Sequence, residues 1–470
     1  MSDQSAQGQD RTVDLVVIGA GPGGEALATG AARAGLEVVV VDRHLVGGEC
    51  PYYGCIPSKM MLRAADSLAE ARRVATLAGD ALVTPSWKPV ATRLDEEATS
   101  GWDDTIAVDR LRDAGATVHH GVGRLDGPGR VRVALAEGAG DGGGEVAYTA
   151  RRGVVLNPGT RPAALPIDGL AGSPYWTNRD AVRVTELPGS LLVVGGGSIG
   201  CEMAQVFARF GVRVTVLEAG PRILGPDEPE ASRLLEEVFV SEGIRVMTGV
   251  AIQRVSYDEG AFAVDLGDGE RLLADKLLVA AGRTPNLDDL GLETVGLDPS
   301  ARTVEVDERM RAGDRLWVIG DVTGKGAFTH VSMYQSAIAL RDVLGEDGPP
   351  ARYHAVPHTT FTDPEVGGVG MTEQQARDAG LRVRVGSTPL EQSSRGFVHG
   401  PGGRGLVKVV EDAERGVLVG ATAMGPSGGE ILGFLAVAVH AEVPTDTLRS
   451  MIYCYPTFHR AIETALADLS

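Results

Sequence analysis

The chain has 470 residues, of which 43% are hydrophobic, 23% charged and only 5% aromatic, and its formal net charge is −19. This length is typical of two to four domains, and the composition is that of a globular protein with a buried core. The acidic balance and the shortage of aromatic rings argue against binding to nucleic acid or to an anionic membrane surface. The chain also contains no apolar run near the roughly 20 residues that a membrane-spanning helix needs.

The first 11 residues are polar and combine no basic segment with an apolar one, so they do not resemble a secretory signal. We expect residues 1–11 to form a disordered tail. The four cysteines, Cys50, Cys55, Cys201 and Cys454, are too few for a disulfide framework. These two observations predict a cytoplasmic protein in a reducing compartment, where a close cysteine pair is more often catalytic than structural.

A nucleotide-binding unit opens the chain. Residues 12–18 are β-rich and apolar, residues 25–34 are helical in pattern, and residues 37–41 form a second apolar strand that ends at Asp42. The glycines of a G-x-G-x-x-G motif stand between the first strand and the helix: Gly19, Gly21 and Gly24. Glycines at these positions allow a tight turn, close approach of a pyrophosphate and close packing of helix on strand, and the acid accepts hydrogen bonds from a ribose.

A pair of cysteines follows. Cys50 and Cys55 lie in a glycine-rich stretch, and a helical pattern runs over about residues 59–76. Pro57 is tolerated in the first turn of a helix, which places Cys55 near the helix start, and Lys59 shares a face with Cys55 at i+4. The spacing predicts a redox-active dithiol, since a C-x4-C pair without further ligands does not fit zinc, and we expect no metal site.

The next segment is less regular. Residues 79–105 lack a clear period, residues 121–123 resemble a turn, and residues 130–134 and 145–149 resemble paired strands. The glycine-rich stretch 138–145 between those strands predicts a flexible hairpin loop.

The nucleotide-binding pattern then occurs a second time. A strand over residues 190–194 precedes a second glycine motif, a helix to about Phe210 and a strand over residues 212–217. The residues of this second motif are Gly195, Gly197 and Gly200, and its acid is Glu218. Two such units favour one tightly held flavin dinucleotide and one exchanging nicotinamide dinucleotide. Because an acid repels a 2′-phosphate, Glu218 favours NAD(H), with NADP(H) as the alternative.

Beyond these patterns, the chain resembles the FAD-dependent pyridine nucleotide–disulfide oxidoreductases of class I, which include dihydrolipoamide dehydrogenase and mercuric reductase. The similarity covers about residues 12–466. It is carried by residues 48–59, which match the redox signature of the family, and by three further stretches, residues 282–286, 316–321 and 357–373.

The resemblance implies an α/β fold with two Rossmann-like dinucleotide-binding domains and an α+β dimerisation domain at the C-terminus. It implies FAD-binding and central regions over residues 12–160 and 285–346, an NAD(P)-binding domain over residues 161–284, and an interface domain over residues 347–470. It also implies a homodimer whose active sites are completed across the interface.

Roles for individual residues follow from the same resemblance. Cys55 would be the charge-transfer thiol against the flavin, Cys50 the interchange thiol, and Lys59 would pair with Glu202. The residues expected to bind FAD are Gly19, Gly21, Gly24, Asp42, Gly48, Lys59, Gly123, Gly159, Asp321 and Thr329. The residues expected to bind NAD are Gly195, Gly197, Gly200, Glu218 and Gly282.

The C-terminal stretch departs from the family. The family carries a histidine that activates the interchange thiol, followed by a glutamate, and these positions here are Tyr455 and Arg460. A phenol titrates near 10 and is a poorer base at neutral pH than an imidazole. Three interpretations stay open: His459 and Glu463 form a displaced pair, the acceptor is not a dithiol-type substrate, or Cys454 serves as an extra thiol.

The predicted function is therefore an NADH-dependent FAD oxidoreductase that passes electrons through Cys50 and Cys55 to a small disulfide acceptor. An NAD(P)H-dependent quinone or metal-ion reductase, in which the dithiol is secondary, is the alternative. A non-catalytic flavoprotein or redox-sensing subunit is the third hypothesis.

Overall fold

The computed structural model describes residues 10–136 and 144–470. The predicted tail and hairpin loop therefore fall largely on undescribed residues, 1–9 and 137–143. For Asp10 and Arg11 the prediction of a disordered tail was wrong, because both belong to strand β1 (Asp10–Ile18). The chain divides into two compact units, unit 1 with residues 1–56, 95–161 and 283–352, and unit 2 with residues 57–94, 162–282 and 353–470.

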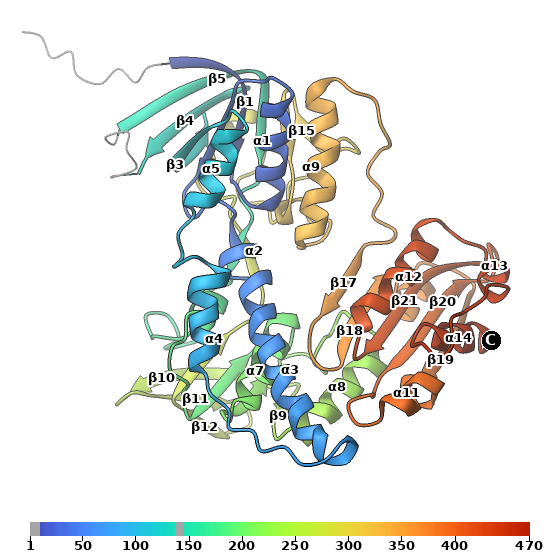
Figure 1. Ribbon diagram of the computed structural model, residues 1–470. Coiled ribbons are helices and arrows are strands. Elements are labelled where there is room, and N and C mark those ends of the chain that lie inside the picture. The colour runs from blue at the N-terminus through green and yellow to red at the C-terminus, as the bar shows by residue number, and fades with distance from the viewer. Residues whose placement is uncertain (1–9, 137–143) are drawn as a thin grey trace, which may run out of the picture. The chain divides into compact units, whose positions relative to one another are not determined.

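Unit 1 is built on a seven-stranded sheet of order β1-β2-β3-β4-β5-β16-β15, in which β1 also pairs with β5. Residues 15–18 of β1 and 38–41 of β2 are apolar and buried, as expected for parallel strands covered on both faces. Helices α1 (Pro22–Arg33) and α9 (Thr329–Leu344) lie side by side (Figure 1). Their contact is close, because a Cβ on Gly30 would lie 2.4 Å from Leu340 Cδ2. The other strands and helices are β2 (Val38–Asp42), α2 (Glu49–Tyr52), α5 (Thr105–Asp113), β3 (Thr117–Leu125), β4 (Arg130–Leu135), β5 (Gly144–Leu156), β15 (Arg311–Gly313) and β16 (Leu316–Val318).

One prediction for the irregular segment was wrong. Residues 121–123 are not a turn, because β3 continues to Leu125 and pairs antiparallel with β4. Residues 79–105, for which the sequence predicted no element, contain α4 (Lys88–Arg93) and a π-helical turn over Leu94–Ala98, and α5 begins at Thr105. The period was hidden because α4 is only six residues long, has a proline in its first turn and buries Val90 alone.

Unit 2 contains the second nucleotide-binding pattern as a four-stranded parallel sheet of order β13-β7-β8-β9. Helix α7 (Ser198–Arg209) follows β7 (Ser190–Val194) directly, and nine of its residues are buried. A three-stranded antiparallel sheet adds to the same apolar core. Helix α3 (Cys55–Leu77) begins in unit 1 and continues into unit 2. The remaining elements of this part are α6 (Asn178–Ala181), β8 (Arg213–Leu217), α8 (Pro229–Ser241), β9 (Arg245–Met247), β10 (Ile252–Asp258), β11 (Ala261–Leu266), β12 (Arg271–Ala274) and β13 (Lys276–Val279). Strands β6 (Thr160–Pro162) and β14 (Arg283–Pro285) form a separate two-stranded sheet, and β14 belongs to unit 1.

The C-terminal part of unit 2 is a five-stranded antiparallel sheet of order β17-β18-β21-β20-β19. Helix α12 (Gly428–His440) packs on β18 and β21, and α14 (Arg460–Ala467) packs on β19 and β20 (Figure 1). The other elements are β17 (Pro357–Thr360), β18 (Glu365–Gly370), α10 (Glu373–Asp378), β19 (Val383–Pro389), α11 (Ser394–His399), β20 (Leu406–Asp412), β21 (Val417–Gly425) and α13 (Thr445–Arg449). The predicted α/β class with two nucleotide-binding units and an α+β C-terminal domain is confirmed. Among the described residues, no helix is long and apolar enough to cross a membrane.

Candidate nucleotide and dithiol sites

The first glycine motif forms a cradle that only glycine fits. Gly19 has a φ of +96°, and a Cβ there would lie 2.1 Å from the Asn157 carbonyl oxygen. A Cβ on Gly24 would lie 2.1 Å from the Gly19 carbonyl oxygen. These distances are far below van der Waals contact, so only glycine allows α1 to approach the end of β1 this closely. Without side chains, the backbone of the loop stays accessible to a ligand.

This cradle fits a dinucleotide. Gly21 caps α1 without a side-chain hydrogen bond, so the first amides of the helix are free to bind a pyrophosphate and the helix dipole favours that anion. Asp42 accepts hydrogen bonds from the backbone amides of Ala20 at 2.7 Å and His44 at 2.8 Å, which hold its carboxylate beside the loop. Burial raises the pKa of Asp42 above its ordinary value, although both hydrogen bonds oppose the shift.

Asn157 packs against this loop and hydrogen-bonds to its backbone, a role that the sequence did not reveal. Its buried side-chain amide donates to the Gly19 carbonyl oxygen at 3.3 Å and accepts from the Ser332 hydroxyl at 3.4 Å. A Cβ on Gly320 would lie 2.7 Å from Asn157 Oδ1. The signal was available, since a polar amide directly after the apolar strand β5 must find partners when it is buried.

Of the other residues expected at the flavin, Lys59 belongs to unit 2 and the rest belong to unit 1. Asp321 accepts from the Thr160 hydroxyl at 2.7 Å, and Arg283 Nε donates to that hydroxyl oxygen at 2.6 Å. Gly159 has a φ of +63° and open space where a Cβ would be. Gly123 lies within strand β3, where a Cβ would be 3.2 Å from Ile18 Cγ1, so its absent side chain serves strand packing.

The two cysteines of the dithiol lie at the beginnings of two consecutive helices. Cys50 is in α2, and Cys55 is the first residue of α3; both are half-buried free cysteines. The Cys50 thiol donates to the Cys55 sulfur, and this hydrogen bond, together with burial, raises the pKa of Cys50. Thr329, the first residue of α9, places its hydroxyl 3.4 Å from Cys55 Sγ. The start of α3 and the hydrogen bond from the Cys50 thiol favour negative charge on Cys55, whereas the Thr329 hydroxyl lies near both sulfurs and opposes the rise in the pKa of Cys50.

The dithiol segment also packs on the first glycine motif. Gly48 has a φ of +73°, and a Cβ there would lie 2.8 Å from Gly21 Cα. Glu49 forms an ion pair with Arg283 at 3.2 Å. The segment that carries the cysteines is therefore fixed against the loop that fits a pyrophosphate.

Lys59 lies one turn after Cys55 in α3 and forms an ion pair with Glu202, with Nζ 3.0 and 2.9 Å from the two carboxylate oxygens. Glu202 is buried, so the alternative of a solvated helix residue is wrong. Phe361, which sequence reasoning did not single out, holds both groups. Its backbone amide donates to Glu202 Oε1 at 2.9 Å, and its ring centroid lies 4.7 Å from Lys59 Nζ.

The second glycine motif repeats the geometry of the first. Gly195 has a φ of +107°, and a Cβ there would lie 2.6 Å from the Ala280 carbonyl oxygen. A Cβ on Gly200 would lie 1.9 Å from the Gly195 carbonyl oxygen, whereas one on Gly197 would meet nothing within 4 Å. Glu218 accepts from the amides of Gly196 and Gly220, both at 2.6 Å.

Three further residues lie in the second nucleotide-binding unit: Gly282, Arg222 and Cys201. Gly282 has a φ of +109° and is open on its Cβ side, so its backbone is accessible. Arg222 turns back onto its own loop and donates to the carbonyl oxygens of Gly225 and Asp227. Cys201 is fully buried and donates to the Gly196 carbonyl oxygen at 3.2 Å, as expected for a packing residue, and burial raises the pKa of its thiol.

The C-terminal stretch forms a turn whose tip is Tyr455. The Tyr455–Pro456 peptide bond is cis, and the Tyr455 side chain is exposed. The Arg460 guanidinium lies 5.5 Å from the centroid of the Tyr455 ring and also pairs with Glu463 at 3.2 Å. Among the described residues, Glu463 makes no hydrogen bond to His459, which lies edge-on to the Phe434 ring instead. The structure therefore does not form the displaced His–Glu pair, and Cys454 lies exposed beside the tip.

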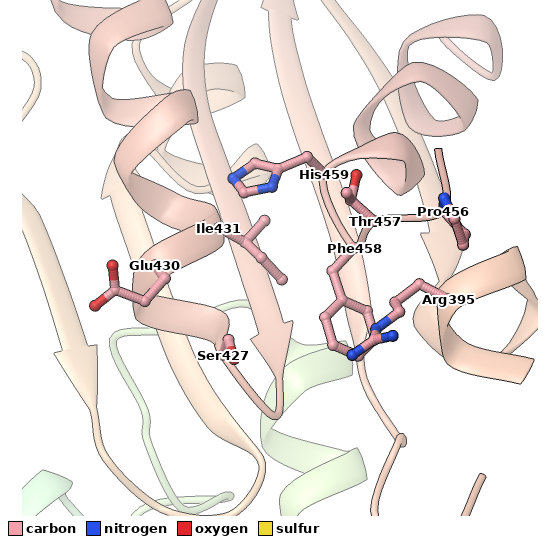
Figure 2. Close-up of a pocket in the computed structure, with 8 residues that line it drawn as sticks. All are labelled: Arg395, Ser427, Glu430, Ile431, Pro456, Thr457, Phe458 and His459. Atoms are coloured by element: carbon pink, nitrogen blue, oxygen red, sulfur yellow. The ribbon is translucent and has the colours of Figure 1, made fainter. Parts of the chain in front are cut away.

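A pocket of about 460 Å³ borders this turn (Figure 2). The ring of His459 points from the turn toward α12, and Arg395 lies over the Phe458 ring with 5.7 Å between guanidinium and centroid. The residues that line it are Arg395, Ser427, Glu430, Ile431, Pro456, Thr457, Phe458 and His459. In the described part of the chain, no group of three or more His, Cys, Asp or Glu side chains could hold a metal ion.

Comparisons with known proteins cover nearly the whole chain. Residues 13–337 match the family described as pyridine nucleotide-disulphide oxidoreductase, and residues 356–466 match the dimerisation domain of that family. The dihydrolipoyl dehydrogenase of Thermus scotoductus is 32% identical over 98% of both chains. The mercuric reductase of Streptomyces lividans is 34% identical over 96% of this chain and 95% of the relative.

Solved structures agree with these matches. The HOCl-induced flavoprotein disulfide reductase RclA from Escherichia coli, solved as a Cu(II) complex, aligns with a TM-score of 0.85 at 26% identity over 97% of this chain and 99% of its own. LpdA from Mycobacterium tuberculosis aligns with a TM-score of 0.85 at 27% identity over the same shares.

Proposed function

The chain belongs to the pyridine nucleotide-disulphide oxidoreductase family, and on that premise we propose that it passes a hydride from NADH through FAD to the Cys50–Cys55 disulfide and on to a small disulfide acceptor. The observation that carries the proposal is the dithiol itself. Cys55 is the first residue of a helix, and its sulfur accepts a hydrogen bond from the Cys50 thiol. The same sulfur lies 3.4 Å from the Thr329 hydroxyl. This arrangement separates a stabilised thiolate from a protonated thiol in one pair.

The family depends on FAD and a pyridine nucleotide, and both glycine cradles fit a dinucleotide. When bound, FAD would supply the two-electron step between a nicotinamide hydride and a disulfide. We assign the loop at Gly19, with Asp42, Asp321 and Thr329, to FAD, and the loop at Gly195, with Glu218, to the nicotinamide nucleotide.

NADH is the proposed reductant rather than NADPH. Glu218 sits at the end of β8, where a ribose would lie, and its carboxylate repels a 2′-phosphate. Arg222, the nearby cation that could have offset this charge, is engaged by its own loop. The predicted cytoplasmic location suits such an enzyme, because a free dithiol persists in a reducing compartment.

Each catalytic residue then has a distinct task. Cys55 would hold negative charge beside the flavin, and Cys50 would exchange with the acceptor. The ion pair with Glu202 would hold Lys59 in place beside the flavin, and Phe361 would fix that pair.

The dimerisation domain extends this assignment to a homodimer. Large apolar side chains are exposed on the domain, including Phe397 at 84% and Ile452 at 98%, and such side chains are typical of a surface that a partner covers. We propose that the turn at Tyr455 completes the site at Cys50 of the partner subunit.

Anaerobic titration with NADH tests the proposal. We expect a long-wavelength charge-transfer absorbance that Cys55→Ser abolishes and that Cys454→Ser, the matched change at an exposed cysteine, leaves intact. Direct bleaching of the flavin without this absorbance in the native enzyme would contradict a dithiol that takes part in the reaction.

The comparisons do not favour the alternative of a quinone or metal-ion reductase in which the dithiol is secondary. Turnover of a disulfide acceptor by Cys50→Ser separates the two. Loss of disulfide reduction supports the proposed route, whereas unchanged reduction would show that electrons bypass the dithiol.

A further inference from the structure

The tip of the C-terminal turn offers an acceptor an aromatic ring and a cation. Tyr455 is 65% exposed, and the Arg460 guanidinium covers one face of its ring at 5.5 Å. The other groups of the turn point elsewhere: His459 lies edge-on to Phe434, and Glu463 pairs with Arg460. The turn therefore presents a ring whose second face is available for stacking.

The turn also lacks a paired acid–base group. A phenol keeps its proton at neutral pH and is a weak acid, so it neither removes a proton from a thiol nor readily gives one to a departing thiolate. No carboxylate orients the imidazole of His459 among the described residues, and the remaining charged groups at the adjoining pocket are Arg395, over Phe458, and Glu430, on α12. A thiolate that leaves at this turn must be stable without a proton.

We propose that Tyr455 and Arg460 make this enzyme selective for aromatic disulfides, whose thiolates leave unprotonated. The inference rests on the proposed function, since it concerns the acceptor of the same dithiol. An aromatic thiolate is stabilised by its ring, which can stack on Tyr455, and the positive charge of Arg460 favours anionic substituents on that ring. An aliphatic disulfide such as lipoamide releases a basic thiolate and gains neither advantage.

The exchange balances as follows. The proton of the Cys50 thiol passes to the Cys55 sulfur, and the Cys50 thiolate attacks one sulfur of R–S–S–R. The S–S bond of the acceptor breaks, and one aryl thiolate leaves as the Cys50–S–S–R bond forms. Cys55 gives its proton to solvent and its thiolate attacks Cys50 Sγ, so the second aryl thiolate leaves and the Cys50–Cys55 disulfide forms. The enzyme pair loses two electrons and the one proton that it held, the acceptor gains the two electrons, and the proton goes to solvent because both products remain thiolates.

A series of small disulfides that differ in the acidity of their thiols tests the selectivity. Bis(carboxy-nitrophenyl) disulfide, an unsubstituted aryl disulfide, hydroxyethyl disulfide and lipoamide would each be reduced with NADH and the native enzyme. We expect kcat/KM to fall steeply along this series, because a less basic thiolate leaves faster. Equal values for lipoamide and the nitrophenyl disulfide would overturn the proposal.

Variants at the tip supply the second readout. Tyr455→His, alone and with Arg460→Glu, should raise kcat/KM for lipoamide by about 100-fold, the usual size of general acid–base catalysis, and flatten the dependence on thiol acidity. The same variants should introduce a pH dependence near the titration range of imidazole. Tyr455→Phe keeps the ring, so the ranking of aryl above aliphatic disulfides should persist in this variant. A Tyr455→His enzyme with unchanged selectivity would show that the tip does not set it.

Failure of the proposed function and failure of the proposed selectivity give different results. If the proposed function is wrong, the native enzyme reduces none of these disulfides and NADH produces no charge-transfer absorbance. If only the selectivity is wrong, the absorbance is present and the disulfides are reduced at rates that do not follow the acidity of their thiols.

Discussion

The two glycine loops share one backbone plan but differ in how they are enclosed. In each loop the acid at the end of the second strand accepts from the residue between the first two glycines and from the amide two positions after itself. Around the first loop, Asn157 approaches the position of a Cβ on Gly21 to 3.3 Å, and Gly48 packs against Gly21. Around the second, a Cβ on Gly197 would meet nothing within 4 Å.

This difference suits two ligands with different lifetimes. A loop enclosed by a buried amide and by the dithiol segment favours a cofactor that stays bound, since release requires those contacts to separate. A loop that opens to free space at its second glycine allows a ligand to enter and leave while the protein stays in place. The enclosure, rather than the glycine pattern, therefore distinguishes the proposed flavin loop from the proposed nicotinamide loop.

The largest effect is expected at the enclosed loop. Gly19→Ala places a methyl group 2.1 Å from the Asn157 carbonyl oxygen at a φ of +96°, so the loop must shift and the bound flavin per chain should fall by at least about tenfold. Flavin absorbance per purified protein measures this. Gly35→Ala is the control, because its φ is also positive, at +89°, but no atom lies within 4 Å, which limits the cost to about 1 kcal/mol. Full flavin content in Gly19→Ala would contradict the enclosed cradle.

A smaller and more selective effect is expected at the open loop. Gly197→Ala adds a methyl group to free space at a φ of −78°, so the protein should fold and keep its flavin. The methyl group would occupy the space that a pyrophosphate approaches, and KM for NADH should rise about tenfold with kcat little changed. Steady-state kinetics test this beside Gly225→Ala, another open glycine of unit 2. Loss of flavin from Gly197→Ala would contradict the assignment of the flavin to the first loop alone.

A smaller effect is expected on the preference for NADH over NADPH. Glu218→Gln removes the charge that repels a 2′-phosphate but keeps an oxygen for the amide of Gly196 or Gly220. The ratio of kcat/KM for NADH to that for NADPH should fall by several-fold to about tenfold. Asp42→Asn, the same kind of change at the first loop, should leave this ratio unaltered. An equal shift in both variants would mean that the two loops do not bind different nucleotides.

The sequence predicted the two loops well because their function depends on local spacing. Glycine, helix and acid follow one another within about 25 residues, and backbone geometry leaves little choice. The enclosure was not predictable, because Asn157, Ser332 and Gly320 come from distant segments and meet only in the fold. The same reason explains why Phe361 was missed beside Glu202. It also explains why the i+4 spacing of His459 and Glu463 did not show that Arg460 would pair with the Glu463 carboxylate.

The smallest expected effect concerns the acid of the enclosed loop. Burial raises the pKa of Asp42, so the folded protein binds the proton more tightly than the unfolded chain does. The contribution of Asp42 to the free energy of unfolding is thus fully present below the ordinary carboxyl range and is lost as pH rises through the higher folded value. Asp42→Asn cannot titrate, so the native chain should lose stability relative to this variant as pH rises above the ordinary carboxyl range near 4. Denaturant unfolding of the flavin-stripped proteins over this rise in pH measures the difference. A native chain that gains stability relative to the variant as pH rises would show that the hydrogen bonds from Ala20 and His44 outweigh burial, and that the first loop holds a charged acid as readily as an exposed site would.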